Sequence, residues 1–125
     1  MHWLVIDDER TFVVNRMQAT IGPSGPEQPE VLNYARTSDE GLLAIAKHCI
    51  EYTQRYGPEL VLYLDHDLGG SDTILPVVNF LLSVKVPGIA WIKIHSQNPV
   101  SKDLVKPLKH AGYICQKVSL PALEK

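Results

Sequence analysis

Short runs of strand-forming residues alternate with stretches of helical periodicity along this chain, and no other feature constrains the fold as strongly. The runs predict strands over residues 3–6, 31–35, 60–64, 89–94 and 113–118. Between them, apolar residues recur at intervals of three and four, as on one face of a helix. This alternation predicts a parallel sheet with helices on both of its faces.

Four helices are expected, each marked by an apolar stripe. The stripes are Phe12, Val14, Met17 and Ile21; Leu42, Leu43, Ala46, Cys49 and Ile50; Ile74, Leu75, Val78, Leu81 and Leu82; and Leu104, Val105, Leu108 and Ala111. Thr37 and Glu40 have the spacing of a capping box at the start of the second helix. Ser71 or Asp72 is expected to cap the third helix, and Pro107 predicts a fourth helix that is kinked or starts late.

Right-handed crossovers leave few topologies for such a chain, and the common five-strand order is 2-1-3-4-5. The predicted fold is therefore a flavodoxin-like three-layer α/β sandwich. With 125 residues, we expect a single domain over residues 1–125. The residues after 118 are too few for a full fifth helix, so that helix is expected to be truncated or absent.

Three of the predicted strands run directly into polar clusters. The clusters are Asp7-Asp8-Glu9-Arg10, Asp65-His66-Asp67-Leu68-Gly69-Gly70 and His95-Ser96-Gln97-Asn98-Pro99. In the order 2-1-3-4-5, these three strands are neighbours, and ligands of open α/β sheets bind at the carboxyl ends of strands. We therefore expect the clusters to form one site.

The carboxylates of these clusters suggest a divalent cation. The candidate ligands are Asp7, Asp8, Asp65 and Asp67. Several carboxylates at one place repel each other, and all-oxygen ligands favour Mg²⁺ or Mn²⁺. The simpler alternative is that they are solvated strand ends whose acids cap the following helix or turn.

Acid–base and phosphate-binding groups surround this acidic centre. His66 and His95 are candidates for general acid and base, and Asp65 for metal ligand or nucleophile. Asp67 either binds the metal or orients a histidine. Strand alternation would place Asp65 and His66 on opposite faces unless a turn begins at His66. The candidate phosphate- or substrate-binding residues are Arg10, Gly69, Gly70, Ser96, Asn98 and Lys117.

Composition narrows the possible partners. A net charge of −2 and a pI near 6.2 do not favour binding to extended duplex nucleic acid. No stretch has the ~20 apolar residues of a membrane span, and the N-terminus does not resemble a signal peptide. Two distant cysteines suit a reducing compartment. We expect a cytoplasmic protein whose partner is a small phosphate ester, a nucleotide or an RNA end.

At these clusters the chain resembles the receiver superfamily of two-component signalling. Leu-Val-Ile-Asp-Asp-Glu-Arg is similar to the receiver segment whose acidic pair binds Mg²⁺, and Asp65 matches the phospho-accepting aspartate. His95-Ser96 stands where receivers keep a threonine or serine. Lys117 lies near the position of the receiver lysine. Receivers have Lys-Pro there, whereas this chain has Lys117-Val118.

Two sequence motifs differ from those of ordinary receivers. They resemble the cyclic-phosphate processing receiver domain, an offshoot of the receivers that is found in bacterial and phage proteins. They are Leu-Asp-His-Asp-Leu-Gly-Gly and Ile-His-Ser-Gln-Asn-Pro, and the resemblance spans about residues 1–118. It implies action on cyclic phosphates, for instance at RNA ends. The expected function is a metal-dependent phosphoesterase, a hydrolase. The alternatives are a response-regulator-type receiver that accepts a phosphoryl group on Asp65, and a non-catalytic module that binds a nucleotide or phosphate.

Overall fold

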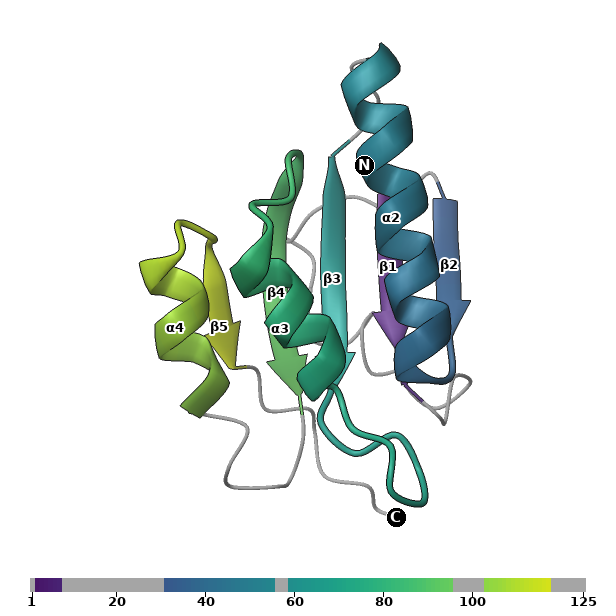
Figure 1. Ribbon diagram of the computed structural model, residues 1–125, viewed down its shortest axis with the longest axis vertical. Helices are drawn as coiled ribbons and strands as arrows, with labels where there is room; N and C mark the ends of the chain where they lie inside the picture. The colour runs from purple at the N-terminus through teal and green to yellow at the C-terminus, as the bar shows by residue number, and fades with distance from the viewer. Residues whose placement is uncertain (1, 8–30, 56–58, 96–102, 118–125) are drawn as a thin grey trace, which may run out of the picture.

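The computed structural model describes residues 2–7, 31–55, 59–95 and 103–117, and its elements are shown in Figure 1. They are β1 (His2–Ile6), β2 (Val31–Ala35), α2 (Ser38–Arg55), β3 (Leu60–Asp65), α3 (Leu75–Ser83), β4 (Ile89–His95), α4 (Val105–His110) and β5 (Cys115–Lys117). The helix expected over residues 12–21 and the truncated fifth helix fall outside the described residues.

The five strands form one parallel sheet in the order β2-β1-β3-β4-β5, as the sequence predicted. Their carboxyl ends lie along one edge, where the arrowheads of Figure 1 point. The register pairs Ile6 with Leu64, Leu64 with Ile94, and Ile94 with Lys117. Residues that directly follow Ile6, Leu64 and Ile94 are therefore level with one another.

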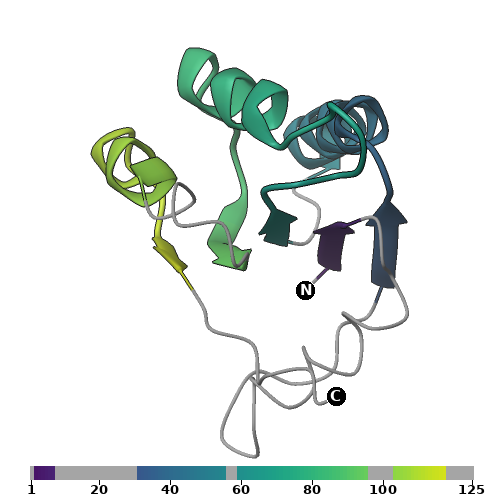
Figure 2. The ribbon, with the colours of Figure 1, turned by 90° about the horizontal axis from the view of Figure 1, so that it is seen from below.

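Both faces of the sheet carry buried side chains. On one face, strand residues such as Leu4, Leu62 and Ile92 pack with helix residues such as Ile45 and Leu81 in the larger core cluster. Figure 2 shows α2, α3 and α4 on one side of the sheet. On the other face, a second cluster consists of Trp3, Val5, Val61 and Tyr63. Burial on both faces is what a doubly wound parallel sheet requires, so the flavodoxin-like fold is confirmed.

The buried face of α2 differs from the predicted stripe. Ile45 is fully buried, whereas Leu43 and Ile50, both expected in the core, are 73% and 58% exposed. Gly41 explains this rotation of the helix, because a Cβ at this position would lie 2.6 Å from Cδ1 of Ile6. The absence of a side chain lets this edge of the helix contact β1, and Leu43 and Ile50 then face solvent.

The buried face of α3 also differs from the predicted stripe. Val77, which was not part of that stripe, is buried beside Val78, whereas Leu75 and Leu82 are 42% and 40% exposed. An apolar spacing of three and four marks a broad face of a helix, and only contact with the sheet decides which part of that face is covered.

The first turn of α2 forms the predicted cap. The Glu40 N–H donates to Oγ1 of Thr37 at 3.1 Å, while Oε1 of Glu40 accepts from the Arg36 N–H at 2.8 Å. The expected cap of α3 was wrong, because Ile74 is the N-cap residue and makes no side-chain capping bond. The fourth helix starts late, as Pro107 predicted, with its first residue at Val105.

Candidate functional site

Three predicted site residues end neighbouring strands at the same level. Asp65 is paired with His95 in the register of β3 and β4. Asp7 follows Ile6, and its N–H still donates to the Ala35 carbonyl at 2.9 Å, so Asp7 continues the β1–β2 pairing. Because Ile6 pairs with Leu64, Asp7 is level with Asp65. The polar ends of β1, β3 and β4 thus meet at one edge of the sheet.

Asp7 and Asp65 also share a face of the sheet. Side chains alternate along a strand, so both continue the face that carries Val5 and Tyr63, opposite α2, α3 and α4. Asp7 is buried at 4% exposure and Asp65 is half-buried. A buried carboxylate must be hydrogen-bonded, paired or bound to a cation. A buried and a half-buried carboxylate on adjacent strands make this edge a candidate site for cationic or polar ligands.

The chain bends at His66, immediately after β3 ends at Asp65. Strict alternation therefore does not fix the direction of this histidine. Its side chain is 8% exposed, and Nδ1 lies 3.1 Å from Oδ1 of Asp67, whose own side chain is 64% exposed. The contact is compatible with the expected role of Asp67 in orienting a histidine, and its role as a metal ligand stays a prediction.

Residues 66–74 form a narrow hairpin beyond the end of β3, visible below α3 in Figure 1. The Ile74 N–H donates to the His66 carbonyl at 2.9 Å, and the Leu68 N–H donates to the Asp72 carbonyl at 3.1 Å. Leu68 is buried in the larger core cluster and anchors the hairpin. The segment that carries the acidic and imidazole groups is thus held in one shape by backbone hydrogen bonds.

The tip of this hairpin is the predicted glycine turn. Gly69 and Gly70 have φ angles of 95° and 58°, and both are exposed. A Cβ at Gly70 would meet nothing within 4 Å, so the backbone conformation and not the available space favours glycine here. The turn presents backbone at the same edge as the carboxylates.

Asp72, on the returning arm of the hairpin, does not cap α3 but binds the start of α2. Its Oδ2 accepts from the Ser38 N–H at 2.9 Å and its Oδ1 from the Ser38 hydroxyl at 2.6 Å. These bonds hold the pKa of the Asp72 carboxyl below its ordinary value, chiefly through the hydroxyl. Sequence reasoning missed this link, because the partners are 34 residues apart.

The remaining candidates are placed less completely. Asp8, Arg10, Ser96 and Asn98 fall outside the described residues. Lys117 is exposed at the carboxyl end of β5, two strands from β3. Arg36, which sequence analysis did not single out, is exposed directly after β2 at the same edge. Its position after a predicted strand was the available signal. Two basic residues thus flank the acidic centre of the edge.

The oxygen donors of this edge fit a magnesium or manganese ion in chemical type. Among the residues that the structure describes, no group of three or more histidine, cysteine or acidic residues could by itself hold a metal. Mg²⁺ commonly binds to one or two carboxylates and completes its shell with water and substrate phosphate. Asp7 and Asp65 are the described residues that would hold it, together with Asp8 from the same cluster.

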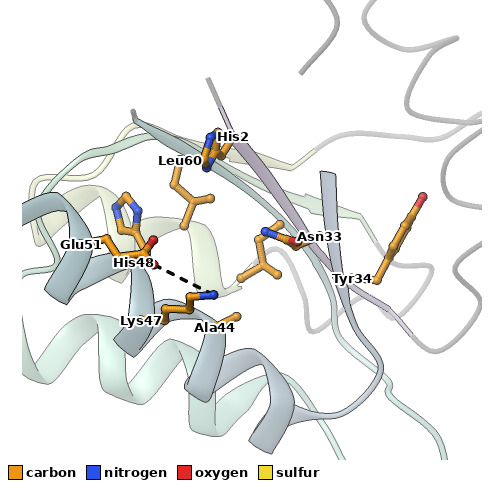
Figure 3. Close-up of a pocket in the computed structure, with 9 residues that line it drawn as sticks. His2, Asn33, Tyr34, Ala44, Lys47, His48, Glu51 and Leu60 are labelled. Carbon is orange, nitrogen blue, oxygen red and sulfur yellow. Dashed lines mark ion pairs between the residues drawn. The ribbon is translucent and has the colours of Figure 1, made fainter. Parts of the chain in front are cut away.

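A pocket of about 400 Å³ lies away from this edge, between α2 and the sheet (Figure 3). It is lined by His2, Leu4, Asn33, Tyr34, Ala44, Lys47, His48, Glu51 and Leu60. His2 and Leu60 begin β1 and β3, so the pocket lies near the amino ends of these strands. The Lys47–Glu51 ion pair at its rim is long, at 4.0 Å, and both side chains are largely exposed. The pocket is separate from the polar clusters.

Comparison with known families identifies the chain. Residues 3–110 match the model of the cyclic-phosphate processing Receiver domain. The match covers most of the sequence, and the chain belongs to this family. No curated protein and no solved structure gives a significant match. Among the described helices, none has the length and apolar character needed to cross a bilayer.

Proposed function

We propose that this receiver-like domain is a metal-dependent phosphoesterase that opens a cyclic phosphate, such as a 2′,3′-cyclic nucleotide or the cyclic phosphate of an RNA end. The observation that carries the proposal is the alignment of Asp7, Asp65 and the His66–Asp67 pair at one sheet edge. Membership of a cyclic-phosphate processing family supports this substrate class.

Each group of residues has a proposed role in hydrolysis. Asp7, Asp8 and Asp65 would hold Mg²⁺ or Mn²⁺, which when bound neutralises charge on phosphoryl oxygens. One of His66 and His95 takes a proton from the attacking water, and the other donates a proton to the leaving ribose oxygen. The water oxygen bonds to phosphorus as one ester P–O bond breaks, so the product is a phosphomonoester.

Asp67 supports the proton transfer indirectly. Its carboxylate contacts Nδ1 of His66 and so fixes the orientation of the ring and favours a proton on that nitrogen. The proposed phosphate-binding groups are Arg10, Gly69, Gly70, Ser96, Asn98 and Lys117. The exposed Arg36 is a further cation at the same edge.

The test is hydrolysis of 2′,3′-cyclic AMP with Mg²⁺ or Mn²⁺ by the wild type, Asp65→Asn and His95→Ala. We expect metal-dependent product from the wild type and a loss of about 10²–10⁴-fold in the histidine variant. His110→Ala is the matched control, because His110 is exposed on α4, away from the edge. Full activity of both site variants would refute the assignment.

If the wild type forms no product from 2′,3′-cyclic AMP, the phosphoesterase hypothesis is rejected for this substrate. Treatment with a small phosphodonor, followed by intact mass measurement, then separates the alternatives. An adduct that is lost in Asp65→Asn indicates a phospho-accepting receiver. Nucleotide binding without adduct or product indicates a binding module.

A further inference from the structure

The hairpin that carries His66 and Asp67 is attached to the rest of the fold by apolar and by polar contacts. The apolar contacts are the buried side chains of Leu68 and Ile74, both in the larger core cluster. The polar contact is the carboxylate of Asp72, which accepts both the N–H and the hydroxyl of Ser38, the first residue of α2. Ser38 is itself buried, at 6% exposure. The polar contact therefore joins the returning arm to the buried start of α2.

This attachment is strong for its size. Hydrogen bonds to an ionised carboxylate are shorter and stronger than bonds between neutral groups, and the Oδ1 to hydroxyl distance is 2.6 Å. The Ser38 N–H belongs to the first turn of α2, where no backbone carbonyl is available to accept it. Loss of the carboxylate would thus leave a buried donor without its acceptor, which is costly.

The two arms of the hairpin are coupled, so the attachment reaches the site. Asp72 accepts the Leu68 N–H through its carbonyl, and Ile74 donates to the His66 carbonyl. Asp67 and Thr73 form an antiparallel bridge between these bonds. His66 and Asp67 lie on the arm opposite Asp72. A displacement of Asp72 therefore distorts at least one of these contacts and moves the arm that carries His66 and Asp67.

We propose that Asp72 and Ser38 are positioning residues that fix the geometry of the His66–Asp67 pair by clamping the hairpin to the start of α2. The proposal rests on the proposed function of this edge for its catalytic consequence, but the clamp itself has consequences in the absence of turnover. Asp72 acts through His66 and Asp67 and is not itself assigned contact with the substrate.

The experiment compares Ser38→Ala and Asp72→Asn with Thr37→Ala. The Thr37 side chain caps the same helix by accepting the Glu40 N–H. Thr37→Ala therefore weakens the start of α2 but leaves the bonds between Ser38 and Asp72 in place. Amide hydrogen exchange is measured at Leu68 and Ile74, whose N–H groups join the two arms. We expect exchange at both to accelerate by about tenfold in Ser38→Ala and Asp72→Asn, and to change little in Thr37→Ala.

Turnover of 2′,3′-cyclic AMP provides the second readout. Loss of a residue that orients a functional group typically costs about 10–100-fold, so we expect kcat to fall by this factor in Ser38→Ala and Asp72→Asn, with KM nearly unchanged. Ser38→Thr retains the hydroxyl and should recover most of the exchange protection and kcat. Thr37→Ala should stay within about twofold of the wild type.

Two results would overturn the clamp. Because the amide of Asp72→Asn can keep one hydrogen bond to Ser38, both site variants are needed for this decision. Equal exchange rates at Leu68 and Ile74 in the wild type, Ser38→Ala and Asp72→Asn would show that the bonds between Ser38 and Asp72 do not hold the hairpin. The second result is an equal change of exchange rate and kcat in Ser38→Ala, Asp72→Asn and Thr37→Ala. If these changes follow the loss of melting temperature, the role of Asp72 and Ser38 is purely structural. If the wild type has no turnover, the proposed function fails, and the exchange rates still decide whether the clamp exists.

Discussion

At the scale of single residues, Asp72 is the charge whose surroundings are most fully defined. Ser38 donates two hydrogen bonds to its carboxylate, and the result is a pKa below the ordinary value of 3.8. The bonds stabilise the charged form in the folded protein, while in the unfolded chain the carboxyl titrates near its ordinary value. The stability of the protein therefore depends on the charge of this residue.

The direction of this pH dependence follows from the lowered pKa. The contribution of Asp72 to the stability of the folded protein is fully present above the unfolded-state pKa of 3.8. It is lost as the pH falls through the lower pKa of the native state. We expect the difference in melting temperature between the wild type and Asp72→Asn to be constant from pH 7 to about 5 and to shrink below about 4. Calorimetry of both proteins across this range measures it. A difference that stays constant down to pH 3 would contradict the prediction.

At the scale of elements, the end of α4 is a Schellman motif that leads into β5. The Gly112 N–H donates to the Lys109 carbonyl and the Tyr113 N–H to the Leu108 carbonyl. Gly112 has a φ of 102°, which an L-residue adopts only with strain. This turn directs Tyr113 back into the core, where it is 5% exposed.

The hydroxyl of Tyr113 joins α4 and β5 to the end of α3. It accepts the Val86 N–H at 2.9 Å and donates to the Leu81 carbonyl at 2.8 Å. Tyr113→Phe would leave the buried Val86 N–H without this acceptor, so we expect a loss of about 1–3 kcal/mol in the free energy of unfolding. Urea denaturation measures this loss.

Tyr52→Phe is the control for this prediction. Tyr52 is half-buried on α2, its ring lies 5.5 Å from that of His48, and the described residues give its hydroxyl no hydrogen bond. We expect this control to stay within about 0.5 kcal/mol of the wild type. A Tyr113→Phe variant as stable as the control would show that the hydroxyl does not stabilise the fold.

At the scale of the whole molecule, Cys115 reports on the integrity of the core. It is 2% exposed, and burial raises the pKa of its thiol to about 11. At pH 8 roughly one such thiol in a thousand is ionised, and the thiolate is the reactive form. Cys49 is only half-buried, although burial also raises the pKa of its thiol.

We therefore expect a thiol reagent at pH 8 to label Cys49 in the folded protein and to label Cys115 only as the molecule unfolds. Cys49→Ser isolates Cys115, and mass spectrometry follows the labelling with time. In denaturant, both cysteines of the wild type should react rapidly. Labelling of Cys115 in native Cys49→Ser at the rate of a free thiol would show that this side of the sheet opens without global unfolding.

The sequence by itself determined the strand order of the sheet and the composition of the polar edge where β1, β3 and β4 end. Strand runs and helical stripes are local patterns, and right-handed crossovers then allow few strand orders, so β1, β3 and β4 could be placed side by side. Because polar clusters follow these strands, the strand order was sufficient to predict that Asp7, Asp65 and His95 lie at one edge. The same residues carried the family resemblance that the match over residues 3–110 confirms.

Only the tertiary structure decided the contacts that depend on distant partners. Local spacing made Ser71 or Asp72 the expected cap of α3, but the Asp72 carboxylate binds Ser38 because the hairpin folds back toward α2. Periodicity also could not tell that Gly41 sets the contact of α2 with β1, which buries Ile45 and exposes Leu43. A local pattern specifies which residues share a face of an element, whereas the packing of elements against each other selects which of those residues are buried and which donors meet which acceptors.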